Sequence, residues 1–435
     1  MNIKFSDETL KFIRTELVDR FVRYTSLGTQ SKEDSETIPS TPEQWELARM
    51  LEKELRELGL KDVRVSDKCY VYATIPAKGG KEFESLPALG FIAHIDTSPA
   101  VPGKFVKPIV HDYKGGDIKL PGIPQLSITV DKNPRLKDAV GSKVISSDGT
   151  TLLGADDKAG VTEIMTMAKF LTSNDTFSHG PVKICFTPDE EVGMGHAGFE
   201  IEQWGAFAAY TVDGEREGEL NEETFNASAA TIVFKGKNVH PGFAKGIMIN
   251  SQYAVCRFVS LLQNYPRPEI TEGREGYIHP YSLSGTEEVS TVKILLRDFE
   301  KSGIESKKKI IQELADKVKG EFPEVQIEVS TKDSYQNMYE ILKSYPFLVD
   351  FAEKAMKASD VHPIKLPIRG GTDGARLSFK GLPCPNLFCG SENVHGKTEW
   401  ISLRSMEKAV QTIVNLVQIW AENREQIKDL AKKKN

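Results

Sequence analysis

The run Ile184-Cys185-Phe186-Thr187-Pro188-Asp189-Glu190-Glu191 places three acids directly after the pattern of a buried strand. Its first four residues are β-branched, aromatic or small and apolar, which is typical of a strand inside a sheet. The adjacent carboxylates of Glu190 and Glu191 would repel each other unless a cation neutralised them. This pair suggests that one carboxylate binds a metal and the other transfers a proton. Taken alone, such a cluster is more often a solvated loop, so the surrounding sequence decides between the two interpretations.

Ligand-type side chains also stand at or near the ends of other apolar runs. They are His94 and Asp96 in and after the run 89–95, Asp213 after 209–212, His395 after 385–390, and Asp156 with Asp157 at the start of a helical pattern. In open sheets built from parallel strands, the ligand site lies beyond the carboxyl ends of the strands. We therefore expect these side chains to gather at one edge of a sheet.

Strands and helices alternate through the first half of the chain. Strand-like runs cover 63–65, 71–75, 89–95, 182–187 and 208–212, and a helical pattern covers 159–171. A helix is also predicted from an N-cap at Thr41, with Leu47, Leu51 and Leu55 on its apolar face and its end at Gly59. This alternation predicts an α/β fold, with a mostly parallel mixed sheet flanked by helices.

The pattern changes between about 224 and 336. The order there is strand, long helix, strand, helix, strand, and one weak strand near Tyr281 completes a β-α-β-β-α-β order. That order predicts a ferredoxin-like α+β insert. The ligand-bearing pattern resumes afterwards and ends on an amphipathic helix at 403–422. We expect a catalytic domain in two segments, 1–223 and 337–435, interrupted by a smaller domain at 224–336.

Composition limits the classes of partner. The chain has 435 residues, 39% hydrophobic and 27% charged, which describes a globular protein of two or three domains. A net charge of −6 without a Lys/Arg-dense block argues against nucleic acid and anionic membranes as partners. We find no apolar stretch long enough to span a bilayer and no signal-peptide core. Five scattered cysteines without a CxxC pair favour a cytosolic location.

The candidate ligands have the composition of a divalent-metal site. Two histidines and several carboxylates form the nitrogen and oxygen set expected of zinc or a related ion. His94 and Asp96 share one face of an extended strand, and a metal-bound histidine usually donates its second N–H to a carboxylate or carbonyl. One carboxylate that bridges two ions about 3.5–4 Å apart would create a two-metal hydrolytic site.

Five motifs make the chain recognisable. They are His94-Ile-Asp96-Thr97, Gly154-Ala-Asp156-Asp157-Lys158, Pro188-Asp189-Glu190-Glu191, Val212-Asp213-Gly214 and Asn393-Val-His395-Gly396-Lys397. Their order and spacing resemble the aminoacylase/carboxypeptidase family of di-zinc metallopeptidases. Asn238-Val-His240-Pro-Gly and Ile368-Arg369-Gly-Gly-Thr-Asp373-Gly extend the resemblance over nearly the whole chain.

The resemblance implies two divalent metal ions per subunit, most simply Zn²⁺. The implied ligands are His94 and Asp213 for one ion, Glu191 and His395 for the other, and Asp156 as the bridge. Asp96 would orient His94, and Glu190 would be the general base. The family also implies a non-proline cis peptide bond between Asp156 and Asp157.

Three further residues are implied to contact the substrate. Arg369 would bind the substrate carboxylate, for which a bidentate arginine is suited. His240 would reach the site of the partner subunit in a homodimer and stabilise the developing oxyanion. Asn393 would contact the substrate backbone. A structural ion pair is the alternative role of Arg369, and without the resemblance His240 would more often be a surface turn residue.

The expected activity is release of the N-terminal residue from short peptides, tripeptides in particular. A dipeptidase, carboxypeptidase or N-acyl amino acid deacylase of the same family would share the metal ligands and the base. A catalytically silent binding protein would have lost one of them, and all are present here. The charged loop 214–218 and Thr398 depart from the pattern, which leaves the specificity open.

Overall fold

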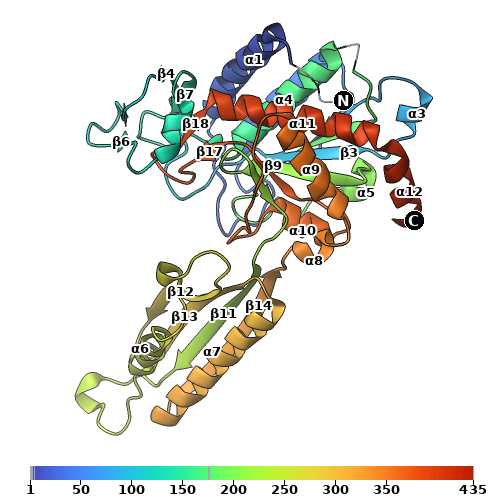
Figure 1. Ribbon diagram of the computed structural model, residues 1–435. Coiled ribbons are helices and arrows are strands. Elements are labelled where there is room, and N and C mark those ends of the chain that lie inside the picture. Colours follow the sequence, from blue (N-terminus) through green and yellow to red (C-terminus); the bar gives the residue numbers. More distant parts are fainter. Residues whose placement is uncertain (1–2, 4, 175–176, 435) are drawn as a thin grey trace. The chain divides into compact units, whose positions relative to one another are not determined.

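The computed structural model describes residues 3, 5–174 and 177–434. The chain divides into two compact units, which are drawn in Figure 1. The larger unit comprises Met1–Glu222, Ile341–Leu366 and Thr372–Asn435, and the smaller unit comprises Glu223–Glu340 and Pro367–Gly371. No helix in the described part of the chain is long and apolar enough to cross a membrane.

The main sheet of the larger unit has the strand order β1-β2-β8-β3-β9-β16-β10-β15. Its strands are β1 (Lys61–Val65), β2 (Val71–Ile75), β3 (Leu89–His94), β8 (Val182–Thr187), β9 (Ala208–Gly214), β10 (Glu219–Asn221), β15 (Ile364–Lys365) and β16 (Asn386–Phe388). At its centre β3 pairs in parallel with both β8 and β9, and β16 continues in parallel with β9. The pairs β2–β8 and β10–β16 are antiparallel, so the predicted mixed sheet is confirmed.

Helices flank this sheet. The helices of the larger unit are α1 (Asp7–Thr25), α2 (Gln44–Glu57), α3 (Lys81–Glu84), α4 (Ala155–Ser173), α5 (Ile201–Trp204), α9 (Pro346–Ala358), α10 (Asp373–Phe379), α11 (Leu403–Glu422) and α12 (Arg424–Lys434). The short helix α8 (Tyr339–Leu342) begins in the smaller unit and ends in the larger one. Helix α4 packs on β3 and β9 and is itself covered by α1 and α11. In another cluster, Ile92 of β3 packs with Trp204 of α5 and Leu377 of α10.

Two features of the N-terminal part differ from the sequence prediction. Helix α1 was not predicted, although its buried residues Ile13, Leu17 and Phe21 follow helical spacing, because charged residues separate them. Helix α2 begins at Gln44 and not after an N-cap at Thr41, so that prediction was wrong. Thr41 instead donates its hydroxyl to the carbonyl of Gln30, which removes it from the cap.

A smaller sheet that the sequence did not predict lies in the same unit, in the order β17-β18-β7-β4. Its strands are β4 (Ile109–Asp112), β7 (Lys143–Ser146), β17 (Ser391–Glu392) and β18 (Trp400–Ser402), and β5 (Ile118–Lys119) and β6 (Ser127–Ile128) form a separate pair. The pairing of β18 with both β17 and β7 fixes the segment 391–402 at both of its ends.

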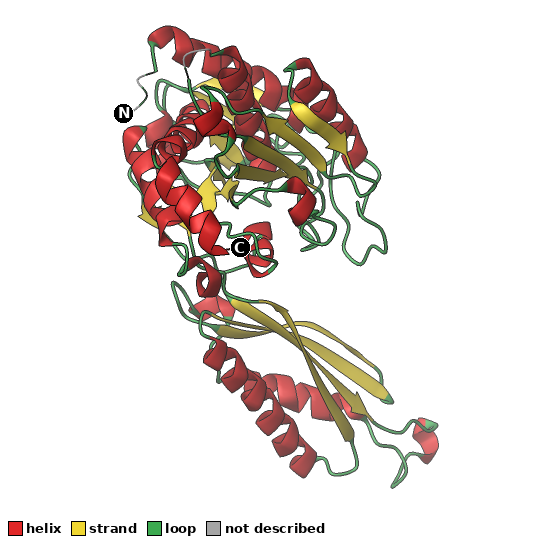
Figure 2. Cartoon of the chain, turned by 90° about the vertical axis from the view of Figure 1, so that its right-hand side faces the viewer, coloured by secondary structure: helices red, strands yellow, loops and turns green. Residues whose placement is uncertain are grey.

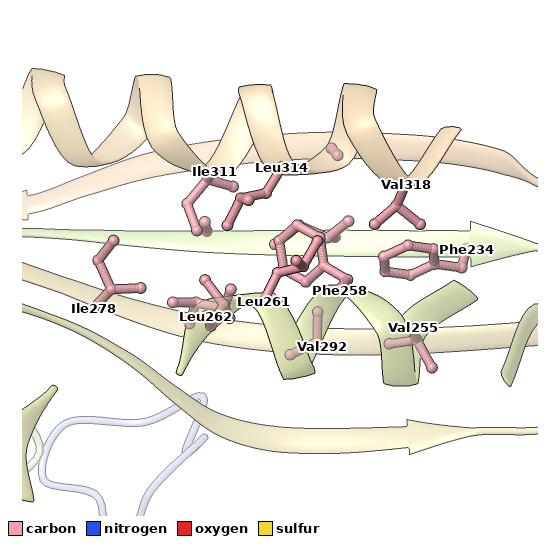
Figure 3. Close-up of a cluster of buried hydrophobic side chains, with 14 of the residues drawn as sticks. Phe234, Val255, Phe258, Leu261, Leu262, Ile278, Val292, Ile311, Leu314 and Val318 are labelled. Atoms are coloured by element: carbon pink, nitrogen blue, oxygen red, sulfur yellow. The ribbon is translucent and has the colours of Figure 1, made fainter. Parts of the chain in front are cut away.

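The smaller unit has the predicted ferredoxin-like order. It runs through β11 (Asn226–Lys235), α6 (Ser251–Leu262), β12 (Tyr277–Gly285), β13 (Val289–Asp298), α7 (Lys301–Glu321) and β14 (Gln326–Tyr335). The antiparallel sheet has the order β12-β13-β11-β14, and both helices cover one of its faces (Figure 2). Figure 3 shows the core between them, where Phe234 and Phe258 pack with side chains of α7 such as Val318.

The fold makes a prediction about Gly90, which lies in the central strand β3. A Cβ atom on Gly90 would stand 2.3 Å from Cη2 of Trp204 and 3.0 Å from Cβ of Ala209. Gly90→Ala therefore overpacks the sheet, and we expect a loss of about 1–3 kcal/mol in the stability of the larger unit. Thermal unfolding of the purified variant measures the change.

Gly320→Ala is the matched control. Gly320 lies exposed in α7, and a Cβ atom on it would meet no other atom within 4 Å. Alanine should therefore stabilise that helix by about 0.5–1 kcal/mol. If Gly90→Ala unfolded at the wild-type temperature, the proposed role of Gly90 in packing β3 against Trp204 would be wrong.

Candidate active site

The five predicted metal ligands form one cluster in the larger unit. His94 is the last residue of β3, Asp213 lies near the end of β9, and Glu191 follows β8. Because β8, β3 and β9 are parallel neighbours, their carboxyl ends meet at one edge of the sheet. Asp156 comes from the first turn of α4, and His395 comes from the loop between β17 and β18.

Asp156 lies between the two histidines. Its Oδ1 is 2.9 Å from Nε2 of His94, and its Oδ2 is 3.2 Å from Nε2 of His395. The peptide bond between Asp156 and Asp157 is cis, as the resemblance implied. The two oxygens of one carboxylate thus face two different imidazoles.

Each histidine also meets one further acid. Nε2 of His94 is 3.5 Å from Oδ1 of Asp213, and Nε2 of His395 is 2.9 Å from Oε2 of Glu191. We call His94 with Asp213 the His94 half-site, and His395 with Glu191 the His395 half-site. Oε1 of Glu191 is buried and has no hydrogen-bond partner among the described residues.

The donor set fits divalent cations. Ligand atoms of His94, Asp156 and Glu191 lie within 4.8 Å of one another, and so do those of His94, Asp157 and Asp213. Burial and the charge of Asp156 raise the pKa of Glu191 to about 7, and burial raises the pKa of Asp213 to about 6. The charged forms of these carboxylates are thus disfavoured in the protein alone, and bound cations would stabilise them.

Asp96 connects the His94 half-site to the acidic turn. Nδ1 of His94 is 3.0 Å from the backbone oxygen of Asp96 and 3.3 Å from its Oδ1. The same carboxylate accepts the backbone N–H groups of Glu190 at 3.0 Å and Glu191 at 3.2 Å. The sequence predicted only the contact with His94. The structure adds that Asp96, which is fully buried, also holds the turn that carries both glutamates.

Glu190 and Glu191 are adjacent but differ in their contacts. Glu191 pairs with His395, whereas no residue in the described part of the chain forms a hydrogen bond with the carboxylate of Glu190. Burial, followed by the charge of Asp213, raises the pKa of Glu190 well above its ordinary value. A carboxylate with a raised pKa beside a ligand cluster is suited to proton transfer.

Asp189 anchors the same turn from the other side, a role that the sequence analysis did not predict. Its Oδ2 accepts the backbone N–H of Ser40 at 2.6 Å, and its Oδ1 accepts from Nε2 of Gln44 at 2.6 Å. The Gln44 side chain is thereby engaged with a residue 145 positions away. A contact over that separation leaves no local pattern in the sequence.

The predicted substrate-binding residues fall in different units. Asn393 belongs to the larger unit, where its Nδ2 donates to Oδ1 of Asn133 at 2.7 Å and to the carbonyl of Thr398 at 3.1 Å. His240 belongs to the smaller unit, is exposed, and accepts the N–H of Gly242 at 3.1 Å.

Arg369 also belongs to the smaller unit. Its Nη1 donates to the carbonyls of Gly273 at 2.9 Å and Glu275 at 2.8 Å, and its Nη2 donates to Oγ1 of Thr271 at 2.9 Å. Its guanidinium carbon lies 5.2 Å from the ring centroid of Phe225. The guanidinium is therefore held by the connector 271–275, through carbonyl and hydroxyl oxygens.

Two buried acids near the cluster received no role from the sequence. Asp373 accepts the hydroxyl of Thr187 at 2.8 Å, and burial raises its pKa to about 7. Glu399 accepts the backbone N–H groups of Leu153 and Gly154, both at 2.7 Å, and of Asp156 at 3.0 Å. Asp373 lies within the motif 368–374, and Glu399 lies two residues after the motif 393–397. These positions were the only available signal, since the partners of both acids are distant in sequence.

Known proteins match the chain over most of its length. Peptidase family M20/M25/M40 matches residues 148–419. Peptidase T of Clostridium perfringens is 48% identical over 405 residues, which cover 93% of this chain and 98% of that protein. Peptidase T of Bacillus licheniformis is 44% identical over 411 residues, which cover 94% of this chain and 100% of that protein.

Solved structures share the fold at lower identity. Aminopeptidase PepT from Bacillus cereus has a TM-score of 0.71 at 20% identity, over 94% of this chain and 99% of its own. A tripeptidase from Staphylococcus aureus has a TM-score of 0.73 at 21% identity, with the same coverage of 94% and 99%. A dinuclear metal-binding M20 peptidase from Bacillus subtilis has a TM-score of 0.65 at 16% identity, over 95% and 99%.

The family match and the near full-length relatives agree with the architecture and with the cluster at the sheet edge. The residues 148–419 contain every predicted metal ligand except His94, and the full-length relatives extend the match toward the N-terminus. The chain therefore belongs to peptidase family M20/M25/M40, a family of peptide hydrolases.

Proposed function

We propose that the protein is a metal-dependent aminopeptidase that releases the N-terminal residue of short peptides, tripeptides in particular. The observation that carries the metal-dependent chemistry is the carboxylate of Asp156, shared between the two half-sites beside the uncommitted carboxylate of Glu190. Relatives at 44–48% identity bear the name Peptidase T, and two proteins of the same fold are named an aminopeptidase and a tripeptidase. These names support the choice of substrate.

The proposed ligands follow the two half-sites. His94 and Asp213 would hold one ion, His395 and Glu191 the other, and Asp156 would contact both. Zn²⁺ is the ion we propose, because imidazole and carboxylate ligands suit it. Two bound ions would neutralise the acids, polarise the scissile carbonyl and lower the pKa of the attacking water.

Glu190 is the proposed general base. Its carboxylate would take a proton from the attacking water and deliver it to the nitrogen of the leaving amine. Asp96 supports this role because its carboxylate fixes the N–H groups of Glu190 and Glu191. The turn then directs Glu191 to His395 and leaves Glu190 uncommitted.

Binding of the substrate is assigned to three residues. Arg369 would bind the C-terminal carboxylate, Asn393 the peptide backbone, and His240 the developing oxyanion. We infer a homodimer formed through the smaller unit, with His240 of one subunit acting in the site of its partner. Exposed apolar side chains on that unit support an interface there, since Phe243 is 73% exposed and Tyr253 is 68% exposed.

The cytosol is the proposed location. All five cysteines are unpaired, and four of them are buried, as expected for a protein kept in a reducing compartment.

A substrate panel tests the proposed function directly. We expect rapid hydrolysis of a free tripeptide, little hydrolysis of its N-acetylated form, and weaker binding of its C-amidated form and of a dipeptide. Full-rate hydrolysis of the N-acetylated peptide would reject the aminopeptidase and favour a deacylase or carboxypeptidase of the same family.

The same panel tests Arg369. Arg369→Ala should raise KM for the free tripeptide much more than for the amidated one, since only the former offers a carboxylate. Loss of one partner of such a pair commonly costs about 2–5 kcal/mol. Arg369→Lys should rescue only part of the loss, because lysine lacks the planar fork. Equal effects on both peptides would show that Arg369 acts only through the connector 271–275.

Substitution of the two adjacent glutamates should have different consequences. Glu190→Gln should keep the metal content and the fold but lower kcat by about 10²–10⁴-fold or more, because it removes the proton acceptor. Glu191→Gln, the matched control one residue away, should lower metal content. Elemental analysis and steady-state kinetics measure both. A metal-loaded Glu190→Gln protein with near wild-type turnover would refute the assignment of the base.

Subunit mixing tests the action of His240 across the dimer. Two inactive variants, His240→Ala and Glu190→Gln, are combined under conditions that allow subunits to exchange. If His240 acts in its partner's site, the mixed dimer has one site with both defects and one with neither, so activity should return. If His240 acts within its own subunit, every site stays defective. A fully active monomer in solution would also contradict the proposal.

A further inference from the structure

Glu399 is a buried acid whose carboxylate contacts the backbone N–H groups of the segment that carries a proposed metal ligand. It is 1% exposed and lies between His395 and strand β18. Its Oε2 accepts the N–H groups of Leu153 and Gly154 at 2.7 Å, and its Oε1 accepts the N–H of Asp156 at 3.0 Å. One carboxylate thus binds three amides of the loop that presents the Asp156 side chain.

These contacts satisfy backbone N–H groups of the kinked segment that precedes the regular turns of helix α4. Gly154 is left-handed with φ of 80°, and the backbone angles of Asp156 and Asp157 are not helical. The regular helix that follows is capped by Asp157, whose Oδ1 accepts the N–H of Gly160 at 3.1 Å. A backbone N–H that is buried outside regular structure still needs an acceptor. Glu399 supplies that acceptor to Asp156 from a position 243 residues away.

The same short segment also supplies a metal ligand. His395 and Glu399 both lie in the loop from β17 to β18, and β18 is held by β17 and β7. One end of the loop contacts Oδ2 of Asp156 through His395, and the other end binds the N–H of Asp156 through Glu399. The loop therefore sets the distance between the shared carboxylate and the His395 half-site.

Asp96 offers a precedent within this chain. It is a second buried acid that binds consecutive amides of a ligand-bearing turn, those of Glu190 and Glu191. Asp96 holds the turn after β8, and Glu399 holds the turn 153–156 at the start of α4. The two turns carry the two acids that face His395.

We propose that Glu399 is a positioning residue of the metal centre, which holds the shared carboxylate of Asp156 in register with His395. The inference rests on the proposed function, because it assigns Glu399 to the support of the metal site named there. Removal of an outer partner of a metal ligand typically costs about 10–100-fold in metal affinity or activity.

The variant Glu399→Gln tests the proposal with little change in shape. Its amide group turns N–H donors toward backbone N–H groups, so at least one of the three hydrogen bonds is lost. We expect zinc affinity, measured by competition with a chromogenic chelator, to fall about 10–100-fold. We expect kcat to fall with it at saturating zinc, with KM for a tripeptide nearly unchanged. Glu399→Asp keeps the charge but is shorter, and should lose less.

Glu407→Gln is the matched control. Glu407 is also a buried acid of the larger unit, but it pairs with Arg14 and accepts from the amide of Gln411 at 3.1 Å. It should keep wild-type zinc affinity and kcat. Hydrogen exchange of the metal-free proteins adds a readout independent of activity. The amides of Leu153, Gly154 and Asp156 should exchange faster in Glu399→Gln and Glu399→Asp, but not in Glu407→Gln.

The outcomes separate the inference from the proposed function. If the wild-type protein binds two ions and Glu399→Gln binds them equally tightly with unchanged kcat, the inference is wrong and the proposed function stands. An equal loss of affinity in Glu407→Gln would likewise overturn it, since general destabilisation would then explain the effect. If the wild-type protein binds no divalent ion, the proposed function fails and the inference fails with it. If Glu399→Gln does not fold, the comparison of Glu399→Asp with Glu407→Gln decides.

Discussion

The carboxylate of Asp156, placed between two imidazoles, is the interaction on which the rest of the site depends. One oxygen lies 2.9 Å from His94 and the other 3.2 Å from His395. Further acids lie close to the same carboxylate, and like charges so near to one another repel each other in a buried site. The cluster is stable only if positive charge offsets the repulsion between these acids. The proposed cations would supply more positive charge than the two histidines do.

The fold brings this arrangement about with rigid elements and two buried anchors. Parallel pairing of β3 with β8 and β9 brings His94, Glu191 and Asp213 to one edge of the sheet. Asp96 then fixes the turn after β8 through its amides, and Glu399 fixes the turn at the start of α4 in the same way. Backbone amides change little in position when side chains move, so both turns hold their ligands in fixed directions.

Periodic segments could be predicted from the sequence, and long-range contacts could not. The strands 71–75 and 182–187 and the helix 403–422 appear at the predicted residues, because their apolar spacing matches their structure. The sequence also placed ligand-type residues near strand ends, and the structure gathers them into one cluster. The engagement of Gln44 by Asp189 and the binding of three amides by Glu399 escaped prediction, because 145 residues or more separate the partners.

Anomalous diffraction from crystals of the zinc-loaded protein tests the central claim most directly. The account predicts two peaks about 3.5–4 Å apart on either side of the Asp156 carboxylate. His94 and Asp213 should be ligands of one ion, and His395 and Glu191 should be ligands of the other. A single peak, or peaks whose ligands do not include Asp156, would contradict the claim that this carboxylate is shared between two metal ions.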